Sequence, residues 1–132
     1  MTKKELQDLY LDGLRDEGYK GEVDDDGDVM FKYEGNKYWI DPDEDDPGIF
    51  NLNYYGNWDF NDDDDIIKGL RSLNIVNRVM KVVKMSMNDK GLLCVNAGFF
   101  VQDPKNFTNH LTRSLGMIQT AISTFVEEME KE

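Results

Sequence analysis

The chain contains one histidine, His110, and Ser114 follows it four positions later. On a helix these residues lie one turn apart, the spacing at which a histidine base can activate a serine hydroxyl. Helices bring many such pairs together, and here no nucleophile elbow or glycine-rich phosphate loop accompanies this pair. Cys94 lies in an apolar stretch, where a cysteine is typically a small buried hydrophobic residue. We therefore predict neither a catalytic residue nor a cofactor.

Aspartates at alternate positions provide the ligands that a hard cation such as calcium prefers. Glu22 to Gly27 begins like a calcium-binding loop, but position twelve, where a bidentate carboxylate is required, falls on Tyr33. The residues available to a cation-responsive module are Asp24, Asp26, Asp43, Asp45 and Asp62 to Asp65. A simpler interpretation assigns Asp26-Gly27 to a hairpin turn and the four consecutive aspartates to a helix N-terminus. We predict no metal site and keep cation binding as the alternative function.

The formal charge of −12 is unevenly distributed. Residues 1–66 hold 21 acidic and 6 basic residues, whereas residues 67–132 hold 6 acidic and 9 basic ones. Without a dense basic stripe to release counterions, binding of DNA or RNA is not expected. No apolar run reaches membrane-spanning length and no signal-peptide core is present, so we expect no membrane association. With one cysteine and hence no internal disulfide, we expect a cytoplasmic or similar reducing compartment.

Aromatic residues are concentrated between the first hairpin and the second helix. They are Tyr38, Trp39, Tyr54, Tyr55, Trp58 and Phe60. A small sheet cannot bury all of them on its core face, and aromatics left on an acidic surface form a plausible contact patch for another chain. We predict Trp39, Tyr55 and Trp58 as the residues that bind a polypeptide partner.

The elements that must position these residues begin with a helix and a meander. Thr2 is expected to cap a helix from Lys3 to Glu17, which Gly18 ends in a left-handed conformation. Val29 to Asp41 alternates apolar and polar residues about Gly35-Asn36, which predicts a tight β-hairpin. A strand within Tyr19 to Asp25 should pair with its first arm, and Ile49 to Tyr55 should form a fourth strand.

The second half of the chain predicts a helix, a hairpin and a long helix. The second helix has an apolar stripe, Ile66, Ile67, Leu70 and Leu73, and the chain becomes β-like from Arg78 to Met87. Leu92 to Val101 is apolar on one face and partly apolar on the other, typical of a strand in mid-sheet or under a second layer that a homodimer partner could supply. Asp103-Pro104 opens the last helix, whose apolar seam favours packing across the sheet over a coiled coil. The fold class is a single α+β domain, residues 1–132, in the order α-β-β-β-β-α-β-β-α.

Two long segments of the sequence resemble those of a known protein family. They are DEGYKGEVDDDGDVMFKYEGNKYWID and LNIVNRVMKVVKMSMNDKGLLCV, to which LLCVNAGFFV and a helix with Phe107 and Leu111 can be added. Together they resemble the YbjN-like family, whose members adopt the fold of type III secretion chaperones. The resemblance implies that fold and a sensory or regulatory role. Chaperones of this fold are small, acidic, dimeric and ATP-independent, and they hold extended segments of a partner. The resemblance implies no catalytic residues.

The leading functional hypothesis is a non-catalytic, chaperone-like or regulatory module that presents a sheet edge and an apolar, aromatic surface to a polypeptide. The alternative is the cation-responsive module described above. An enzyme is the third hypothesis, and it requires a pocket that brings His110 near several carboxylates.

Overall fold

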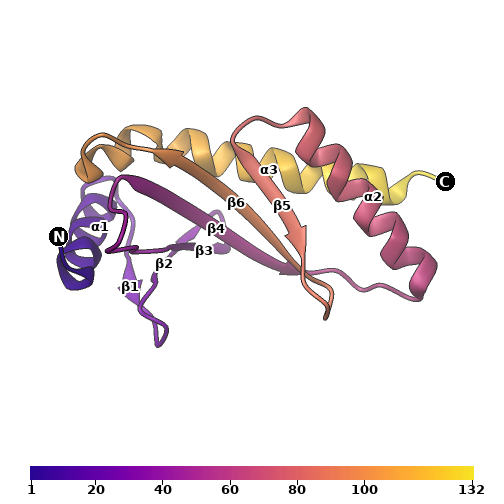
Figure 1. The fold of residues 1–132 in the computed structure, drawn as a ribbon, viewed down its shortest axis with the longest axis horizontal. Helices are drawn as coiled ribbons and strands as arrows, with labels where there is room; N and C mark the ends of the chain where they lie inside the picture. The colour runs from indigo at the N-terminus through magenta and orange to yellow at the C-terminus, as the bar shows by residue number, and fades with distance from the viewer.

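The computed structural model describes residues 1–132 and places three helices against one antiparallel sheet (Figure 1). The helices are α1 (Lys3–Asp16), α2 (Asp63–Val79) and α3 (Thr108–Glu130), and a 3-10 turn, Pro104–Phe107, precedes α3. The strands are β1 (Glu22–Val23), β2 (Val29–Tyr33), β3 (Asn36–Ile40), β4 (Ile49–Asn57), β5 (Val83–Met87) and β6 (Leu92–Phe100). Their order in the sheet is β1-β2-β3-β4-β6-β5. The predicted α+β fold class and element order are confirmed.

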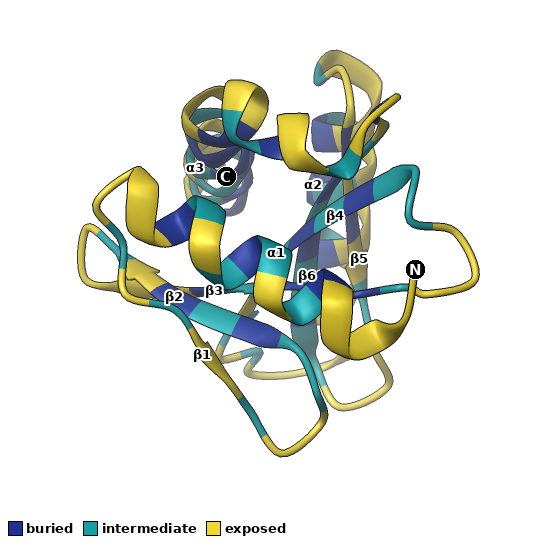
Figure 2. Cartoon of the chain, turned by 90° about the vertical axis from the view of Figure 1, so that its left-hand side faces the viewer, coloured by how far each residue is buried: buried dark blue, intermediate teal, exposed yellow.

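The strand register aligns one apolar side chain from each long strand into a row across the sheet. This row is Val29, Ile40, Leu52, Ala97 and Val83, and all five are buried. Because side chains alternate between the faces of a strand, the buried positions define one face, here called the covered face. Seen from the end of the molecule, α1 and α3 lie on the same side of β2 and β3 (Figure 2).

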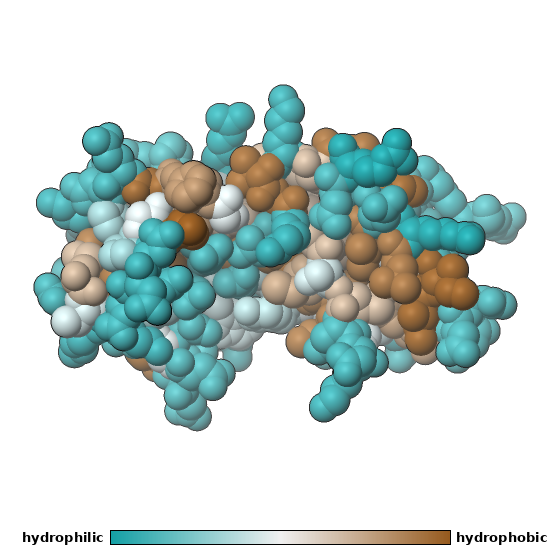
Figure 3. Space-filling view, viewed as in Figure 1, coloured by the Kyte–Doolittle hydropathy of each residue, from teal (hydrophilic) through white to brown (hydrophobic).

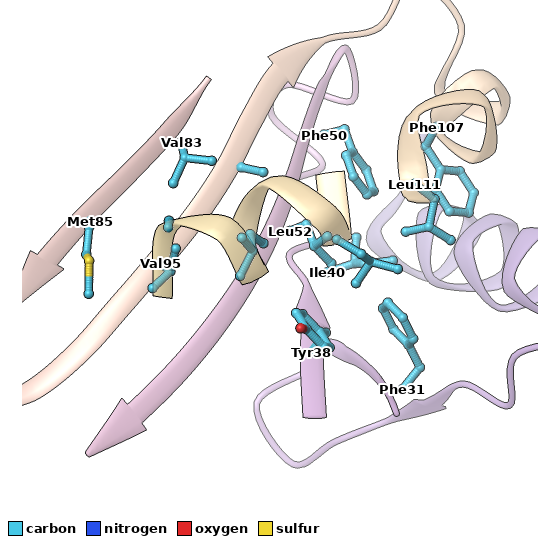
Figure 4. Packing of buried hydrophobic residues seen from close by; sticks show 14 of the residues in the cluster. Phe31, Tyr38, Ile40, Phe50, Leu52, Val83, Met85, Val95, Phe107 and Leu111 are labelled. Atoms are coloured by element: carbon cyan, nitrogen blue, oxygen red, sulfur yellow. The ribbon is translucent and has the colours of Figure 1, made fainter. Parts of the chain in front are cut away.

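The core forms between the covered face and the helices. Leu6, Tyr10 and Leu14 of α1 are fully or almost fully buried, as an amphipathic helix requires. Phe50 stacks on Phe107 at a centroid distance of 5.4 Å, and Tyr10 meets Phe107 edge-on at 5.1 Å. Figure 4 shows Phe50 of β4 close to Phe107 and to Leu111 at the start of α3. The long α3 therefore lies across the sheet, as its apolar seam predicts.

The turn of the first hairpin differs from the prediction by one residue. Tyr33 pairs with Asn36, so the two turn residues are Glu34 and Gly35, with φ of 50° and 82°, and not Gly35-Asn36. Two positive φ values are what a type I′ hairpin turn requires. The apolar pattern could not distinguish the two registers, because both pair covered-face residues with one another. The two registers differ in which residues take the positive φ of the turn: the observed register places Glu34 there, whereas the predicted one required Asn36.

Three predicted boundaries also change. β1 spans only two residues, whereas the sequence suggested a strand within Tyr19 to Asp25. Helix α2 continues through Arg78 and Val79, so the strand that was expected from Arg78 begins only at Val83. Val79 is β-branched, which favours a strand, but it continues α2 with its side chain exposed, because strand preference depends strongly on context. Asp62 caps α2 and three aspartates follow in its first turn, as expected from the helix dipole.

The predicted apolar stripe of α2 is wrong for three of its four residues, since only Leu73 packs against the core. Ile66, Ile67 and Leu70 are 38%, 46% and 48% exposed. The buried face instead carries Gly69, Ser72 and Val76. Gly69 leaves room for the ring of Phe60, which a Cβ at this position would meet at 2.6 Å. The Ser72 hydroxyl donates a hydrogen bond to Met129 Sδ of α3 at 3.4 Å. The three exposed residues, here called the α2 patch, belong to the hydrophobic area over α2 in Figure 3.

Candidate functional site

The second face of the sheet contains no buried residue and is called the open face. Its central row, across five strands, is Met30, Trp39, Asn53, Asn96 and Lys84. The next row adds Tyr55, Cys94 and Ser86. Both rows follow from the strand period of two, since each residue is one position from a covered-face residue. A continuous strip of polar and aromatic side chains therefore crosses the sheet on the side opposite the core.

Trp39 and Tyr55 meet on the open face, although sixteen positions separate them in the chain. Their ring centroids are 5.3 Å apart and the rings are edge-to-face, a preferred aromatic geometry. Tyr55 is 39% exposed and Trp39 is half-buried. Neither belongs to the core or packs against it. Two of the three predicted partner-binding residues thus form one solvent-accessible aromatic pair.

Trp58, the third predicted residue, lies elsewhere. It follows the end of β4 and packs edge-on against Phe125 of α3, with centroids 5.3 Å apart. Phe125 is buried and Trp58 is half-buried against the core. The structure therefore does not bring Trp58 together with Trp39 and Tyr55, because beyond Asn57 the strand alternation no longer determines the direction of a side chain.

An asparagine ladder lies beside the aromatic pair, and the sequence analysis did not single it out. Asn96 Nδ2 donates hydrogen bonds to Asn53 Oδ1 at 2.9 Å and to Asn51 Oδ1 at 3.3 Å. Asn96 Oδ1 and the amide nitrogens of Asn51 and Asn53 make no side-chain hydrogen bond within the protein. These groups can take the N–H and C=O groups of a bound chain. The sequence feature that could have identified this ladder is asparagine, and not a charged residue, at three strand positions that face away from the core, 51, 53 and 96.

Carboxylates border one side of the pair. Burial raises the pKa of the Tyr55 hydroxyl, and the nearby Cys94, Asp28, Asp41 and Asp24 raise it further. The pKa of Asp28 is itself raised, chiefly by burial and then by its neighbouring aspartates. The opposite side of the strip ends at Lys84, whose charge opposes the burial-induced rise in the Cys94 pKa. On the open face the aspartates therefore lie beside Tyr55, whereas its basic residues are Lys84 on β5 and the exposed pair Lys32 and Lys37 on β2 and β3.

The edge of β5 is partly occupied by a side chain of α2. Asn77 Nδ2 donates to the Met85 carbonyl at 2.9 Å, and Asn77 Oδ1 accepts from the Met85 amide at 2.8 Å. This asparagine makes the two hydrogen bonds that a further strand would make at that residue, a known way to protect a sheet edge. Since β1 has only two residues at the other edge, the open face offers more to a partner than either edge.

The aspartates considered for cation binding hold local backbone structure. Asp24 Oδ1 accepts from the Asp26 and Asp28 amides at 3.0 and 2.9 Å, and Asp43 Oδ1 accepts from the Asp45 amide at 3.0 Å. Such turns are a usual role of aspartate in loops. No group of three or more histidine, cysteine or acidic side chains has the arrangement of a metal site.

His110 and Ser114 share a surface pocket, but no hydrogen bond joins them and no carboxylate lines it. The imidazole packs edge-on against Phe99 at 5.2 Å. The arrangement that an enzyme would need, His110 near several carboxylates, is not the one that the fold produces.

The comparisons with known proteins agree with this fold. No protein-family model matches the chain, and no curated protein sequence matches it. The crystal structure of YbjN from E. coli, a candidate transcription regulator, superposes with a TM-score of 0.67 at 15% identity over 87% of each chain. The Yersinia pestis type III secretion chaperone SycH, in complex with a stable fragment of YscM2, superposes with a TM-score of 0.56 at 10% identity, covering 90% of this chain and 98% of SycH. The chain has the YbjN-like, type III secretion chaperone-like fold, as the sequence resemblance implied. No helix is long and apolar enough to cross a membrane.

Proposed function

We propose that the protein is a non-catalytic binding module, chaperone-like or regulatory, whose open face holds an extended polypeptide. The observation that carries this proposal is the Trp39–Tyr55 pair on a sheet face without a covering layer. Aromatic side chains are enriched at protein interfaces because they bury a large area and lose little conformational entropy. The structure of SycH with a YscM2 fragment supports a polypeptide ligand for this fold.

The chemistry of the open face indicates which polypeptide it would hold. The aromatic pair fits an apolar or aromatic side chain of the ligand, and the unpaired amide groups of the asparagine ladder fit its backbone. Asp24, Asp28 and Asp41 lie near Tyr55 and would attract lysine or arginine. The ligand is therefore an extended segment in which basic residues accompany apolar ones, which also suits a chain of net charge −12.

Selection from a library of random linear peptides tests this proposal. The wild-type protein should enrich peptides with adjacent basic and apolar residues. The double variant Trp39→Ala/Tyr55→Ala should lose at least about tenfold in affinity for them, since truncation of an interface hot spot, a class enriched in Trp and Tyr, costs about 2 kcal/mol or more. Val79→Ala, which removes an exposed apolar side chain from α2 outside the α2 patch, is the control and should bind like the wild type. Equal binding by the double variant would refute the proposal.

We also propose that the chain forms a homodimer through the α2 patch, and not through Leu92 to Val101. Ile66, Ile67 and Leu70 form an exposed apolar surface on a helix with acidic residues in its first turn and with Arg71 and Arg78 further along. In a two-fold pair, antiparallel α2 helices would oppose the acidic start of one to the basic part of the other. The same surface patch thus complements itself in charge.

Light scattering tests the dimer. The wild type should give twice the 15.3 kDa mass of the chain, and Leu70→Glu should give a monomer because it places a charge in the apolar contact. Phe100→Glu, a change at the exposed end of β6, should remain dimeric. A dimer that survives Leu70→Glu but dissociates with Phe100→Glu would place the interface on β6. A monomeric wild type would refute the dimer altogether.

A further inference from the structure

A pocket of about 320 Å³ lies on the helix side of the sheet, between the start of α3, the loop that joins α2 to β5, and the last part of β6. Its lining contains Lys81, Val82, Phe99, His110, Arg113, Ser114 and Met117. This volume is at the lower end of the range for small-molecule sites in proteins. None of these residues lies on the open face, so the pocket is separate from the proposed polypeptide site.

The charge of this pocket is opposite to that of the protein. Lys81 and Arg113 line it together with His110, and no acidic residue does. Three other surface pockets are lined by carboxylates, including one with five acidic side chains against α1. Lys81 and Arg113 take part in none of the three ion pairs of the protein. In a chain of net charge −12, two unpaired cations over one pocket form a local site for an anion.

Ser114 adds a polar group that has no partner inside the protein. It is 3% exposed. Elsewhere on the same helix, Thr120 and Thr124 donate hydrogen bonds to carbonyls one turn back, at 3.0 and 2.9 Å. The Ser114 hydroxyl makes no such bond, and unlike the buried Tyr38 hydroxyl its oxygen keeps contact with solvent, on the side where Ser114 lines the pocket. Because Ser114 lines the pocket, a bound ligand can satisfy its hydroxyl.

The remaining lining residues are apolar or aromatic. Phe99 and Met117 both pack against the hydrophobic core, and Phe99 supports the His110 ring edge-on. A ligand that only carried charge would leave this surface exposed to water. The pocket therefore combines cations at its rim with an apolar floor, which is the usual composition of a small-ligand site.

The backbone at the rim is strained. Val82 has a φ of 72° and is half exposed. This left-handed conformation is a genuine outlier for a β-branched residue and is energetically costly. Such strain persists only where the surroundings impose it, and it occurs often at ligand sites. Here it bends the chain between α2 and β5 at the position that brings Lys81 and Val82 to the pocket.

We propose that this pocket binds a small organic anion, with a carboxylate or phosphate group on a compact apolar body. Arg113 and Lys81 hold the anionic group, the Ser114 hydroxyl donates a hydrogen bond to it, and the apolar body rests on Phe99 and Met117. The anion joins α3 to the loop between α2 and β5, so binding restrains the position of α2.

Titration with phenyl phosphate and benzoate, followed by amide NMR spectra, tests the proposal. At least one of these probes should bind with a dissociation constant of about 1 mM or tighter and should shift the amide signals of Val82, Phe99 and Ser114. Inorganic phosphate and benzyl alcohol, which carry only the charge or only the apolar body, should bind at least about tenfold more weakly.

Matched variants identify the groups responsible. Arg113→Gln should weaken probe binding about tenfold or more, because it removes a charge-assisted hydrogen bond. Ser114→Ala should weaken it about threefold to tenfold. Arg15→Gln makes the same change of charge on α1, outside the pocket lining, and should bind like the wild type.

Three results would overturn the proposal. They are no shift with either probe at about 10 mM, equal affinity for benzyl alcohol, and unchanged affinity in Arg113→Gln. A circular dichroism spectrum like that of the wild type shows that a variant that fails to bind is still folded.

Discussion

Trp39 and Trp58 are the two tryptophans of the chain, and they lie on opposite sides of the sheet. Trp39 pairs with Tyr55 on the open face, whereas Trp58 packs on Phe125 against the core. Both belong to the same aromatic-rich stretch of sequence, and both were predicted to bind a partner. The difference shows that residue type indicates a surplus of aromatics, whereas position on a strand decides which of them remains accessible.

The same contrast holds for the two faces as a whole. On the covered face, cross-strand rows contain aliphatic and aromatic residues and are buried under helices. On the open face, the neighbouring row contains a tryptophan, two asparagines and a lysine. The covered face therefore stabilises the fold, and the open face can change its residues at little cost to stability.

Truncation of a side chain should show the largest difference between the two faces, measured as the loss in free energy of unfolding. Phe50→Ala removes a fully buried ring that contacts Tyr10, Phe99 and Phe107, and should lower the free energy of unfolding by about 3–5 kcal/mol. Asn51→Ala, one position later on the open face, should change it by less than about 1 kcal/mol. Urea unfolding of both variants measures the difference. Similar losses would mean that the open face also contributes to the core.

Alkaline titration tests the burial of Tyr10, the buried tyrosine of α1 on the covered side of the sheet. Burial raises the pKa of Tyr10 to about 12, with smaller contributions from Asp41 and Asp43, whereas the unfolded chain ionises near 10. The unfolded state thus loses its proton first, and Tyr10 should lower stability by about 2–3 kcal/mol as pH rises from about 10 to 12. Tyr10→Phe should lack this contribution. If Tyr10→Phe lost as much free energy of unfolding as the wild type between about pH 10 and 12, the assignment to Tyr10 would be wrong.

Alanine substitution of the two tryptophans should separate stability from binding. Trp58→Ala removes a half-buried ring from Phe125 and should destabilise the protein by about 1–3 kcal/mol, without effect on affinity for a selected peptide. Trp39→Ala should cost less than about 1 kcal/mol and should weaken peptide binding. Thermal unfolding and fluorescence titration measure the two quantities. If Trp58→Ala weakened peptide binding and Trp39→Ala lowered only stability, the partner-binding residue would be Trp58 and not Trp39.

The smallest expected effect concerns the thiol of the open face. Burial raises the pKa of Cys94 despite the opposing charge of Lys84, so little thiolate is present near pH 8. Alkylation by iodoacetamide should therefore be slower in the folded protein than in urea, and slower again with a bound peptide. Alkylation at the same rate in the folded and unfolded states would show that Cys94 is not sheltered beside Tyr55.

Alternation and turn residues in the sequence were sufficient to predict the fold class, the element order and the faces of β2, β3 and β4. The local sequence pattern did not determine features that depend on packing, such as the position of the hairpin turn and the buried face of α2. The hairpin turn shifted to Glu34-Gly35 because two registers satisfied the same apolar pattern. Three residues of the α2 stripe, Ile66, Ile67 and Leu70, are exposed because the small residues Gly69 and Ser72 allow a closer approach to neighbouring elements than larger side chains would.

The candidate site was predictable to the same extent. Trp39 and Tyr55 lie on the polar faces of strands, so sequence alternation identified them. Their proximity depends on the pairing of β3 with β4, which the sequence does not specify. The asparagine ladder depends on the pairing of β4 with β6, which are separated by a helix and a strand. Trp58 lies apart from the pair because it follows the last residue of β4, where the strand period no longer applies.

The central claim is that the open face, and not another apolar surface, binds the polypeptide. With two tryptophans, the protein has two indole N–H signals in a proton–nitrogen NMR spectrum. On titration with a peptide selected by the wild type, the Trp39 signal should shift strongly and the Trp58 signal should stay in place. A shift of Trp58 with Trp39 unchanged would contradict the claim and would place the ligand at the end of β4.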